Sequence, residues 1–222
     1  MIVIVDYCKG NLKSVERGFQ AIGAQATITA DPDQIACARA IVLPGVGAFA
    51  DASATMQQNG QLQAIRSSIK AGVPFLGICL GLHLLYEEGL EGREDNDFKK
   101  GSSKHTRGLA VLPGVVSALP HLDVGGAKYK IPHVGWNSIE FSEGGNSVPL
   151  FKNIPSGECF YFTHSYMAPD TPYTVATTTH SVTFPSVVSY NDTAFGVQFH
   201  PEKSSDAGLI ILKNFYHIVK AS

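Results

Sequence analysis

The sequence predicts an α/β fold in which a mostly parallel central sheet lies between two layers of helices, with antiparallel additions in the C-terminal half. Three observations predict it: strand-like and helix-like segments alternate in the first half, strand-like runs dominate the second half, and an amphipathic helix pattern over residues 206–219 closes the chain. Alternating strands and helices form parallel sheets because each crossover helix packs back onto the sheet. The 222 residues show no repeat or linker, so we expect one domain over residues 1–222.

In the first half, short apolar runs predict strands. These runs cover residues 2–6, 26–29, 40–43 and 73–79. A helix is expected over residues 12–22, which Asn11 can cap and Gly23 can end. Two further helical patterns follow, over residues 61–70 and 82–88.

The second half changes character. Residues 91–107 are charged and weakly periodic, which predicts a surface excursion. The strand-like runs after it cover residues 109–116, 133–141, 160–166, 173–178, 187–190 and 194–199. Turns such as Asp192-Thr193 separate some of these runs, so we expect antiparallel additions to the sheet.

Composition excludes several classes of function. The chain is 44% hydrophobic and 16% charged, which supports a sizeable core rather than disorder. A net charge of -2 gives no basic footprint, so nucleic acid is not an expected partner. The apolar start lacks a basic leader, and no apolar run approaches a membrane span. Four cysteines without CxxC or metal-ligand spacing fit a reducing cytoplasm, and we expect neither a metal nor a cofactor.

Cys79 stands between two glycines, in the run Gly77-Ile78-Cys79-Leu80-Gly81, directly after a predicted strand and before a helical pattern. A strand that turns sharply into a helix needs small neighbours, and the same arrangement with serine is a nucleophile elbow. A cysteine there sits at a helix N-terminus, where free N–H groups favour the thiolate. The pattern alone equally allows a buried core cysteine.

A second motif, Phe199-His200-Pro201-Glu202, favours the nucleophile. Proline disfavours helical backbone in the residue before it, so His200 should be extended. In an extended chain, positions i and i+2 share a side about 7 Å apart, so Glu202 can reach the imidazole. A base oriented by a carboxylate would complete a triad with Cys79. The alternative is a surface loop with a solvated glutamate.

Together the two motifs resemble the class I (triad) glutamine amidotransferases. The segments Ile131-Pro132-His133-Val134-Gly135-Trp136-Asn137 and Tyr161-Phe162-Thr163-His164-Ser165-Tyr166 look like those of one subfamily, the glutaminase subunit of imidazole glycerol phosphate synthase from histidine biosynthesis. The opening Asp6-Tyr7 with Gly10-Asn11-Leu12 also fits this subfamily. The resemblance covers nearly the whole chain and implies a flavodoxin-like three-layer sandwich.

This resemblance implies hydrolysis of L-glutamine to glutamate and ammonia by a Cys79, His200 and Glu202 triad. Charge on the reacting carbonyl oxygen needs donors, for which the N–H groups of Leu80 and Val46 are the candidates. Gly45 and Gly47 flank Val46 and would let its peptide rotate, which offers a switch between an active and an idle state.

The resemblance also implies substrate and partner residues. Gly45, Gly47, His83, Ser165 and Tyr166 would bind substrate, although the family usually carries glutamine at the position of His83. The ammonia would pass to a (β/α)8-barrel synthase subunit, which binds the nucleotide, makes imidazole glycerol phosphate and aminoimidazole carboxamide ribonucleotide (AICAR), and activates the glutaminase in a heterodimer. The residues expected toward this partner are Asn11, Pro132, Trp136 and Lys203.

Three other functions remain open on the sequence. The chain could serve as glutaminase for another synthase, or act alone as a cysteine hydrolase on γ-glutamyl compounds. It could also be a catalytically silent regulatory subunit; the complete triad argues against this, while His83 argues weakly for it. Activity without a partner would favour the stand-alone hydrolase.

Overall fold

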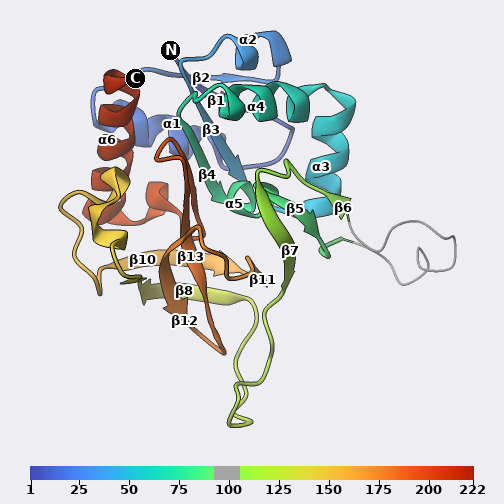
Figure 1. Ribbon diagram of the computed structural model, residues 1–222, viewed down its shortest axis with the longest axis vertical. Coiled ribbons are helices and arrows are strands. Elements are labelled where there is room, and N and C mark those ends of the chain that lie inside the picture. Colours follow the sequence, from blue (N-terminus) through green and yellow to red (C-terminus); the bar gives the residue numbers. More distant parts are fainter. Residues whose placement is uncertain (93–105) are drawn as a thin grey trace, which may run out of the picture.

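The computed structural model describes residues 1–92 and 106–222, so most of the expected surface excursion over residues 91–107 lies outside the described residues. In the described part of the chain, eight strands form a central sheet in the order β2-β1-β3-β4-β14-β13-β12-β9 (Figure 1). Its parallel part comprises β2 (Ala26–Thr29), β1 (Ile2–Val5), β3 (Ala40–Gly45), β4 (Phe75–Cys79) and β14 (Ala194–Val197). Its antiparallel part comprises β13 (Thr183–Tyr190), β12 (Thr174–Thr179) and β9 (Glu140–Phe141).

Helices cover both faces of this sheet, which confirms the predicted three layers. One face carries α1 (Leu12–Ala21) and α6 (Ser205–Ala221), and the other carries α2 (Pro32–Ala36), α3 (Phe49–Gln58) and α4 (Gln61–Lys70). Successive side chains of β1 point to opposite faces of the sheet, so they belong to two separate core clusters. Ile2 and Ile4 pack in the same cluster as Phe19 of α1, whereas Val3 and Val5 pack in the cluster that holds Met56 of α3.

Three of the predicted strand runs, over residues 109–116, 133–141 and 160–166, contribute wholly or largely to two smaller sheets instead of the central one. The first smaller sheet pairs β8 (His133–Ser138) with β10 (Cys159–His164) in antiparallel register. The second has the order β11-β7-β5-β6, formed by β11 (Tyr166–Met167), β7 (Leu112–Ala118), β5 (Tyr86–Gly89) and β6 (Thr106–Arg107). The expectation of antiparallel additions is therefore correct for β13, β12 and β9, while β14 returns parallel to β4.

Two local predictions were wrong. The helical pattern over residues 82–88 gives only the short helix α5 (Leu80–Leu84), because Tyr86 is fully buried and pairs with Leu112 as part of β5. Asn11 occupies the N-cap position of α1, but its side chain makes no capping hydrogen bond to a described residue. Its backbone carbonyl accepts from the N–H of Ser14 instead, at 3.1 Å.

The sequence interpretation also missed two helices. The start of α2 carries an N-terminal signal, because Asp31 accepts a hydrogen bond from the N–H of Asp33 at 2.9 Å and Pro32 opens the helix. By contrast, α3 buries one face made of Phe49, Ala52, Ser53 and Met56, and the small residues on it give only a weak apolar pattern in the sequence. Within residues 1–92 and 106–222, the remaining short elements are three 3-10 turns: η2 (Gly145–Ser147), η3 (Pro149–Phe151) and η4 (Pro201–Lys203).

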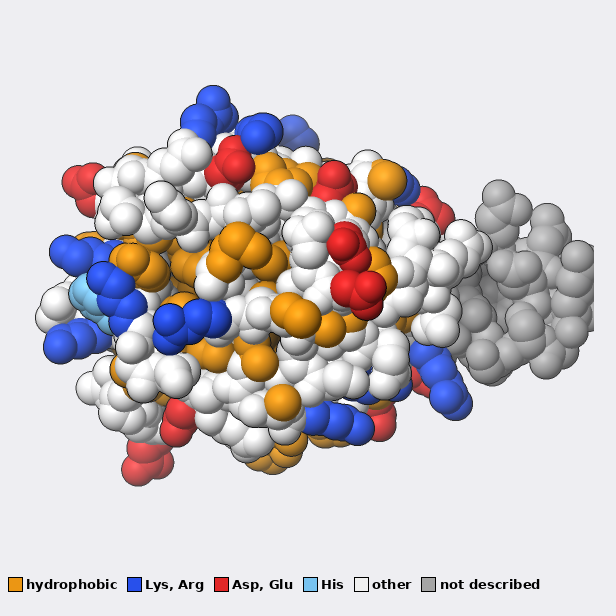
Figure 2. Space-filling view, turned by 90° about the horizontal axis from the view of Figure 1, so that it is seen from above, with side chains coloured by type: hydrophobic (Ala, Val, Ile, Leu, Met, Phe, Trp, Pro, Cys, Tyr) orange, Lys and Arg blue, Asp and Glu red, His pale blue; other side chains and the backbone are white. Residues whose placement is uncertain are grey.

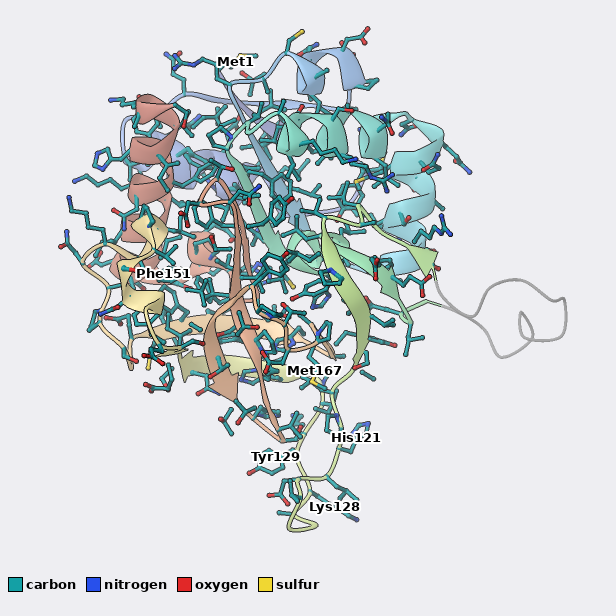
Figure 3. The ribbon with its side chains drawn as sticks, viewed as in Figure 1. Met1, His121, Lys128, Tyr129, Phe151 and Met167 are labelled. Atoms are coloured by element: carbon teal, nitrogen blue, oxygen red, sulfur yellow. The ribbon has the colours of Figure 1, made fainter. Side chains whose placement is uncertain are left out.

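The two ends of the molecule differ. Figure 2 views the end at which the parallel strands begin, where apolar side chains lie among scattered Lys, Arg, Asp and Glu side chains. At the opposite end, residues 119–132 project away from the body and carry His121, Lys128 and Tyr129 (Figure 3). A bridge between Leu122 and Lys128 holds this projection together. Among the described residues, no helix is long and apolar enough to cross a membrane.

Candidate active site

Cys79 lies at the turn from β4 into α5, with φ 55° and ψ −105°. A positive φ is unfavourable for a residue with a side chain and persists only where the surroundings enforce it. Here the neighbours enforce it: a Cβ on Gly77 would collide with the backbone of Gly81, and a Cβ on Gly81 would collide with the carbonyl of Leu43. Both glycines are therefore required for the elbow that the sequence predicts.

The end of β3 lies beside this elbow. Gly45 is the register partner of Cys79 in the parallel pairing of β3 with β4. A Cβ on Gly45 would collide with the hydroxyl of buried Tyr7 and approach the side chain of Leu80. Gly47 adopts φ +94°, and the side chain between the two glycines, Val46, is 41% exposed. The structure thus brings the Val46 segment next to Cys79, at the carboxyl edge of the sheet.

His200 and Glu202 form a tight pair. Nδ1 of His200 lies 2.8 Å from Oε1 of Glu202, and both side chains are 2% exposed. His200 is extended, as predicted, but Glu202 lies in the 3-10 turn η4, so the two do not share one side of an extended strand. The hydroxyl of Ser204 donates to the carbonyl of His200 at 2.7 Å and accepts from the N–H of Tyr161 at 3.0 Å, which fixes the turn.

The other ring nitrogen of His200 is available for Cys79. Among the described residues, Nε2 of His200 is buried without a hydrogen-bond partner. Burial disfavours the imidazolium, but the interactions with Cys79 and Glu202 outweigh it and raise the pKa of His200 well above its usual range. The thiol and the imidazole are therefore close enough to influence each other, as a nucleophile and its base must be.

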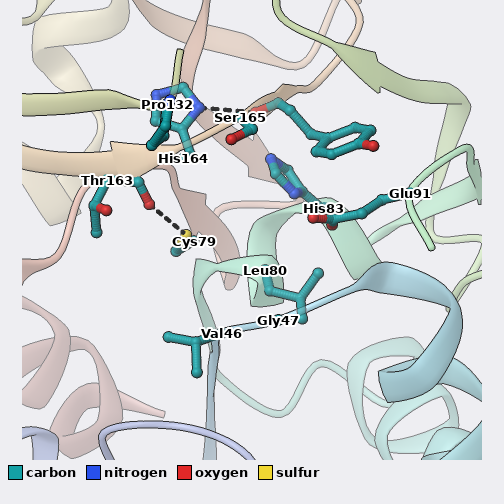
Figure 4. Close-up of a pocket in the computed structure, with 11 residues that line it drawn as sticks. Val46, Gly47, Cys79, Leu80, His83, Glu91, Pro132, Thr163, His164 and Ser165 are labelled. Atoms are coloured by element: carbon teal, nitrogen blue, oxygen red, sulfur yellow. Dashed lines mark hydrogen bonds between the residues drawn. The ribbon is translucent and has the colours of Figure 1, made fainter.

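A cavity of about 280 Å³ opens over Cys79 (Figure 4). The residues that line it are Val46, Gly47, Cys79, Leu80, His83, Glu91, Pro132, Thr163, His164, Ser165 and Tyr166. Most of the predicted oxyanion and substrate residues are thus on its wall, while Gly45 lies behind Leu80. Pro132, which was predicted at a partner interface, lines the cavity as well.

Three wall residues were missed by the sequence interpretation: Glu91, Thr163 and His164. Glu91 was assigned to the surface excursion because charged residues follow it. Burial raises the pKa of its carboxyl, an N–H of Phe49 at 3.2 Å opposes the rise, and Asp51 adds to it. The carbonyl of Thr163 lies 3.9 Å from Sγ of Cys79.

His83 has a buried polar partner that the sequence did not suggest. Its Nε2 lies 2.7 Å from Oε1 of Gln198, and Nε2 of Gln198 lies 3.7 Å from Sγ of Cys79. His83 is 3% exposed and Gln198 is fully buried. Burial lowers the pKa of His83 to about 4, although the bond to Gln198 opposes this, so the ring is neutral at pH 7.

Two further histidines, His133 and His164, form a hydrogen-bonded pair behind the cavity wall. Nδ1 of His164 lies 2.8 Å from the carbonyl of Tyr166, and its Nε2 lies 3.0 Å from Nδ1 of His133. The amide of Asn137 reaches Nε2 of His133 at 3.3 Å. Burial lowers the pKa of His133 to about 4 and that of His164 to about 3. The uncharged pair fixes the backbone that carries Ser165 and Tyr166.

The remaining predicted partner residues are exposed. Trp136 is 54% exposed and packs edge-on against Tyr161, with ring centroids 6.3 Å apart. The ammonium of Lys203 lies 5.9 Å from the centre of the same Tyr161 ring. Asn11 is exposed at the start of α1. Trp136, Tyr161 and Lys203 thus form one surface cluster.

The described residues contain neither a metal-ligand cluster nor a disulfide. No group of three or more His, Cys, Asp or Glu residues there could hold a metal ion. All four cysteines lie among the described residues, and each is a free thiol. Cys79 is the buried one, while Cys8, Cys37 and Cys159 are exposed.

Comparisons with known proteins identify the family of this chain. Residues 3–219 match the family described as glutamine amidotransferase class-I. The chain is 44% identical over 221 residues to imidazole glycerol phosphate synthase subunit HisH of Moorella thermoacetica, covering 99% of this chain and 95% of that one. It is 42% identical over 218 residues to the subunit HisH of Syntrophotalea carbinolica, covering 97% and 98%.

A solved glutamine amidotransferase structure shares the fold, with a TM-score of 0.69 and 16% identity over 99% of this chain and 100% of the other. The strained cysteine elbow, the buried histidine–glutamate pair and these relatives all lead to the same conclusion. The chain belongs to the class I glutamine amidotransferase family, among relatives named imidazole glycerol phosphate synthase subunit HisH.

Proposed function

We propose that this chain is the glutaminase subunit of imidazole glycerol phosphate synthase and releases ammonia from L-glutamine for histidine biosynthesis. One observation carries the proposal. A cysteine held at a strained elbow stands beside an imidazole that is paired with a buried carboxylate, in a chain 44% identical to a protein named as that subunit. The geometry supports the chemistry, and the relatives support the pathway.

The triad performs the hydrolysis in two steps. The Cys79 thiolate attacks the side-chain amide carbon of glutamine, and His200 gives a proton to the nitrogen that leaves as ammonia. A water molecule activated by His200 then cleaves the γ-glutamyl thioester and releases glutamate. Glu202 accepts a hydrogen bond from Nδ1 of His200, which holds the ring in the orientation that both steps need.

Backbone N–H groups stabilise the oxyanion that forms in each step. Leu80 opens α5, and the first N–H groups of a helix have no partner within the helix. Its N–H lies directly after the nucleophile, where an oxyanion donor is expected. Val46 supplies the second donor when its peptide turns inward, and the flanking Gly45 and Gly47 make that rotation possible.

The cavity suits an amino-acid substrate. Its volume of about 280 Å³ lies at the small end of the range for ligand pockets. The carboxylate of Glu91 on its wall offers a partner for the α-ammonium group of glutamine. His83, Ser165 and Tyr166 contribute the other contacts near the backbone end of the substrate.

The ammonia passes to a (β/α)8-barrel subunit docked on the surface around Trp136. Trp136 is 54% exposed and neighbouring Val134 is 56% exposed, an unusual exposure for large apolar side chains. Lys203 and Tyr161 border them, and Pro132 links this surface to the cavity. Asn11 belongs to the same interface.

The heterodimer works in the cytoplasm, where the free thiols of this chain persist.

One experiment tests the proposal. Glutaminase activity is measured for the chain alone, with the barrel subunit, and with the barrel subunit and its ribonucleotide substrate. We expect negligible, low and high activity in that order, because the partner turns Val46 toward the oxyanion. High activity of the chain alone would instead indicate a stand-alone hydrolase, and inactivity in all three mixtures would indicate a silent subunit.

A further inference from the structure

Gln198 connects the nucleophile to His83 inside the protein. Its Nε2 lies 3.7 Å from Sγ of Cys79 and its Oε1 lies 2.7 Å from Nε2 of His83. Gln198 is fully buried and His83 is 3% exposed. The contact to the sulfur joins positions 119 residues apart, so the fold, not the local sequence, creates it.

The direction of each hydrogen bond depends on the tautomer of His83. An amide has N–H donors on one atom and an acceptor oxygen on the other. If the amide of Gln198 were turned over, its oxygen would face the sulfur and repel a thiolate. When the neutral imidazole of His83 carries its proton on Nε2, it donates to Oε1 of Gln198, and the amide N–H of Gln198 then faces Cys79. In this tautomer His83 holds the orientation in which Gln198 donates to Cys79.

We propose that Gln198 is a catalytic residue whose amide N–H stabilises the Cys79 thiolate, and that His83 is a positioning residue which fixes the orientation of that amide. The inference deepens the proposed function, because it concerns the same nucleophile. It gives a physical role to the histidine at position 83, where the resemblance implies glutamine. A glutamine side chain there could also donate an N–H to Oε1 of Gln198.

Other charged or titratable groups also face the sulfur. His200 favours the thiolate as a cation, whereas Tyr7, whose pKa is raised first by burial and then by the charge of Cys79, stays a neutral phenol and places no charge against it. Neither group changes in a variant at residue 198 or 83. The contribution of Gln198 can therefore be measured as a difference between variants that share the same His200 and Tyr7.

The measurement is the alkylation rate of Cys79 by iodoacetamide in the full chain. Peptide mass spectrometry separates Cys79 from the exposed Cys8, Cys37 and Cys159. A lost stabilisation of the thiolate lowers the rate more at pH 7 than at pH 10, whereas a loss of access to the sulfur lowers both rates equally. The ratio of the alkylation rate at pH 7 to the rate at pH 10 therefore separates stabilisation of the thiolate from a change in access to Cys79.

We expect Gln198→Leu and His83→Leu each to lower the rate at pH 7 by about threefold to tenfold, the size expected for a hydrogen bond to a charged group at long distance. The rate at pH 10 should change little. His83→Gln should restore most of the rate, because it returns a donor to Gln198. The double variant should lose no more than Gln198→Leu, since His83 acts through Gln198.

Asn214→Leu is the matched control. Asn214 is a buried amide that donates to the carbonyls of Leu150 and Lys152 at 3.0 and 2.8 Å, in the outer layer formed by α6 and η3. Its loss should lower stability and leave the ratio of the two rates unchanged. An equal loss of ratio in Asn214→Leu, or unchanged ratios in both leucine variants at the site, would overturn the inference.

The outcome stays decisive if one variant fails to fold. If Gln198→Leu is unfolded by circular dichroism, the comparison of His83→Leu with His83→Gln still decides, because only the glutamine can donate. These rates need neither glutamine nor a partner subunit. Failure of the proposed function would appear in the three-mixture glutaminase assay, while failure of this inference would appear in the alkylation ratios.

Discussion

Nδ1 of His200 lies 2.8 Å from Oε1 of Glu202, and a 3-10 turn that begins at Pro201 makes this contact between residues only two positions apart. The turn, not an extended chain, brings the carboxylate back toward the ring. Because both side chains are 2% exposed, water cannot replace the carboxylate if it is removed.

Glu202→Gln should lower the kcat of the partner-activated glutaminase by about 100-fold or more, since the amide no longer favours the imidazolium. The KM for glutamine should change little, because Glu202 does not line the cavity. Steady-state kinetics of the complex provide the measurement. A variant with unchanged kcat would show that Glu202 has no part in the reaction.

Gly81→Ala should destroy the elbow. The added methyl group would collide with the carbonyl of Leu43, so we expect a loss of about 1–3 kcal/mol in the free energy of unfolding, with slower alkylation of Cys79. Gly125→Ala is the control, because an added Cβ there would meet only Oδ1 of Asp123 within 4 Å, at 3.4 Å. Urea unfolding of both variants gives the comparison. Equal stability would mean that the backbone yields without strain.

Stability should depend on the neutral histidines of the cavity. The pKa values of His83 and His133 are lowered to about 4 and that of His164 to about 3, whereas the unfolded chain binds these protons near pH 6.5. Their contribution is complete above pH 6.5 and is lost as the pH falls toward 4, because the unfolded state then binds more protons. The slope is at most about 1.4 kcal/mol per pH unit for each histidine.

His164→Gln should make this slope shallower between pH 6.5 and 5, because one of the histidines no longer takes up a proton on unfolding. Phe184→Leu is a matched control, since this ring packs against both His133 and His164 without titrating. It should lower stability by a similar amount at every pH. Urea unfolding at several pH values distinguishes the two, and an unchanged slope in His164→Gln would contradict the assignment.

Trp136→Ala should weaken binding of the barrel subunit by about 30-fold, as expected when an exposed aromatic anchor is truncated. Lys203→Glu should weaken it as well and reduce the loss of affinity that added salt causes, because salt then screens a repulsion instead of an attraction. The control is Lys220→Glu on α6. The ammonium of Lys220 lies 4.4 Å from the centre of the Tyr216 ring, so this pair makes the same kind of contact as Lys203 and Tyr161 without lining the cavity. Titration calorimetry measures all variants. Normal binding by Trp136→Ala would place the interface elsewhere.

Much of the fold could be predicted from the sequence because its signals are local. Helix α4 and strand β2 were predicted with their observed bounds, since apolar periodicity and turn residues mark them. The stretch after Cys79 was misread because Leu82, Leu84 and Leu85 repeat like a helix, while pairing with β7 makes Tyr86 the start of a strand. Pairing partners far along the chain decide such cases.

The sequence by itself determined the reactive centre. Gly77 is needed because a Cβ there would collide with the backbone of Gly81, four residues on, and Pro201 opens the turn that brings Glu202 back to His200. Only the tertiary structure decided what surrounds Cys79. The contacts from Thr163 and Gln198 span 84 and 119 residues. They exist because β4 pairs with β14, while β10 lies across the carboxyl ends of the parallel strands (Figure 1). Steric clashes between neighbouring residues can be read from the sequence, but contacts between distant residues depend on the order of the strands in the sheet.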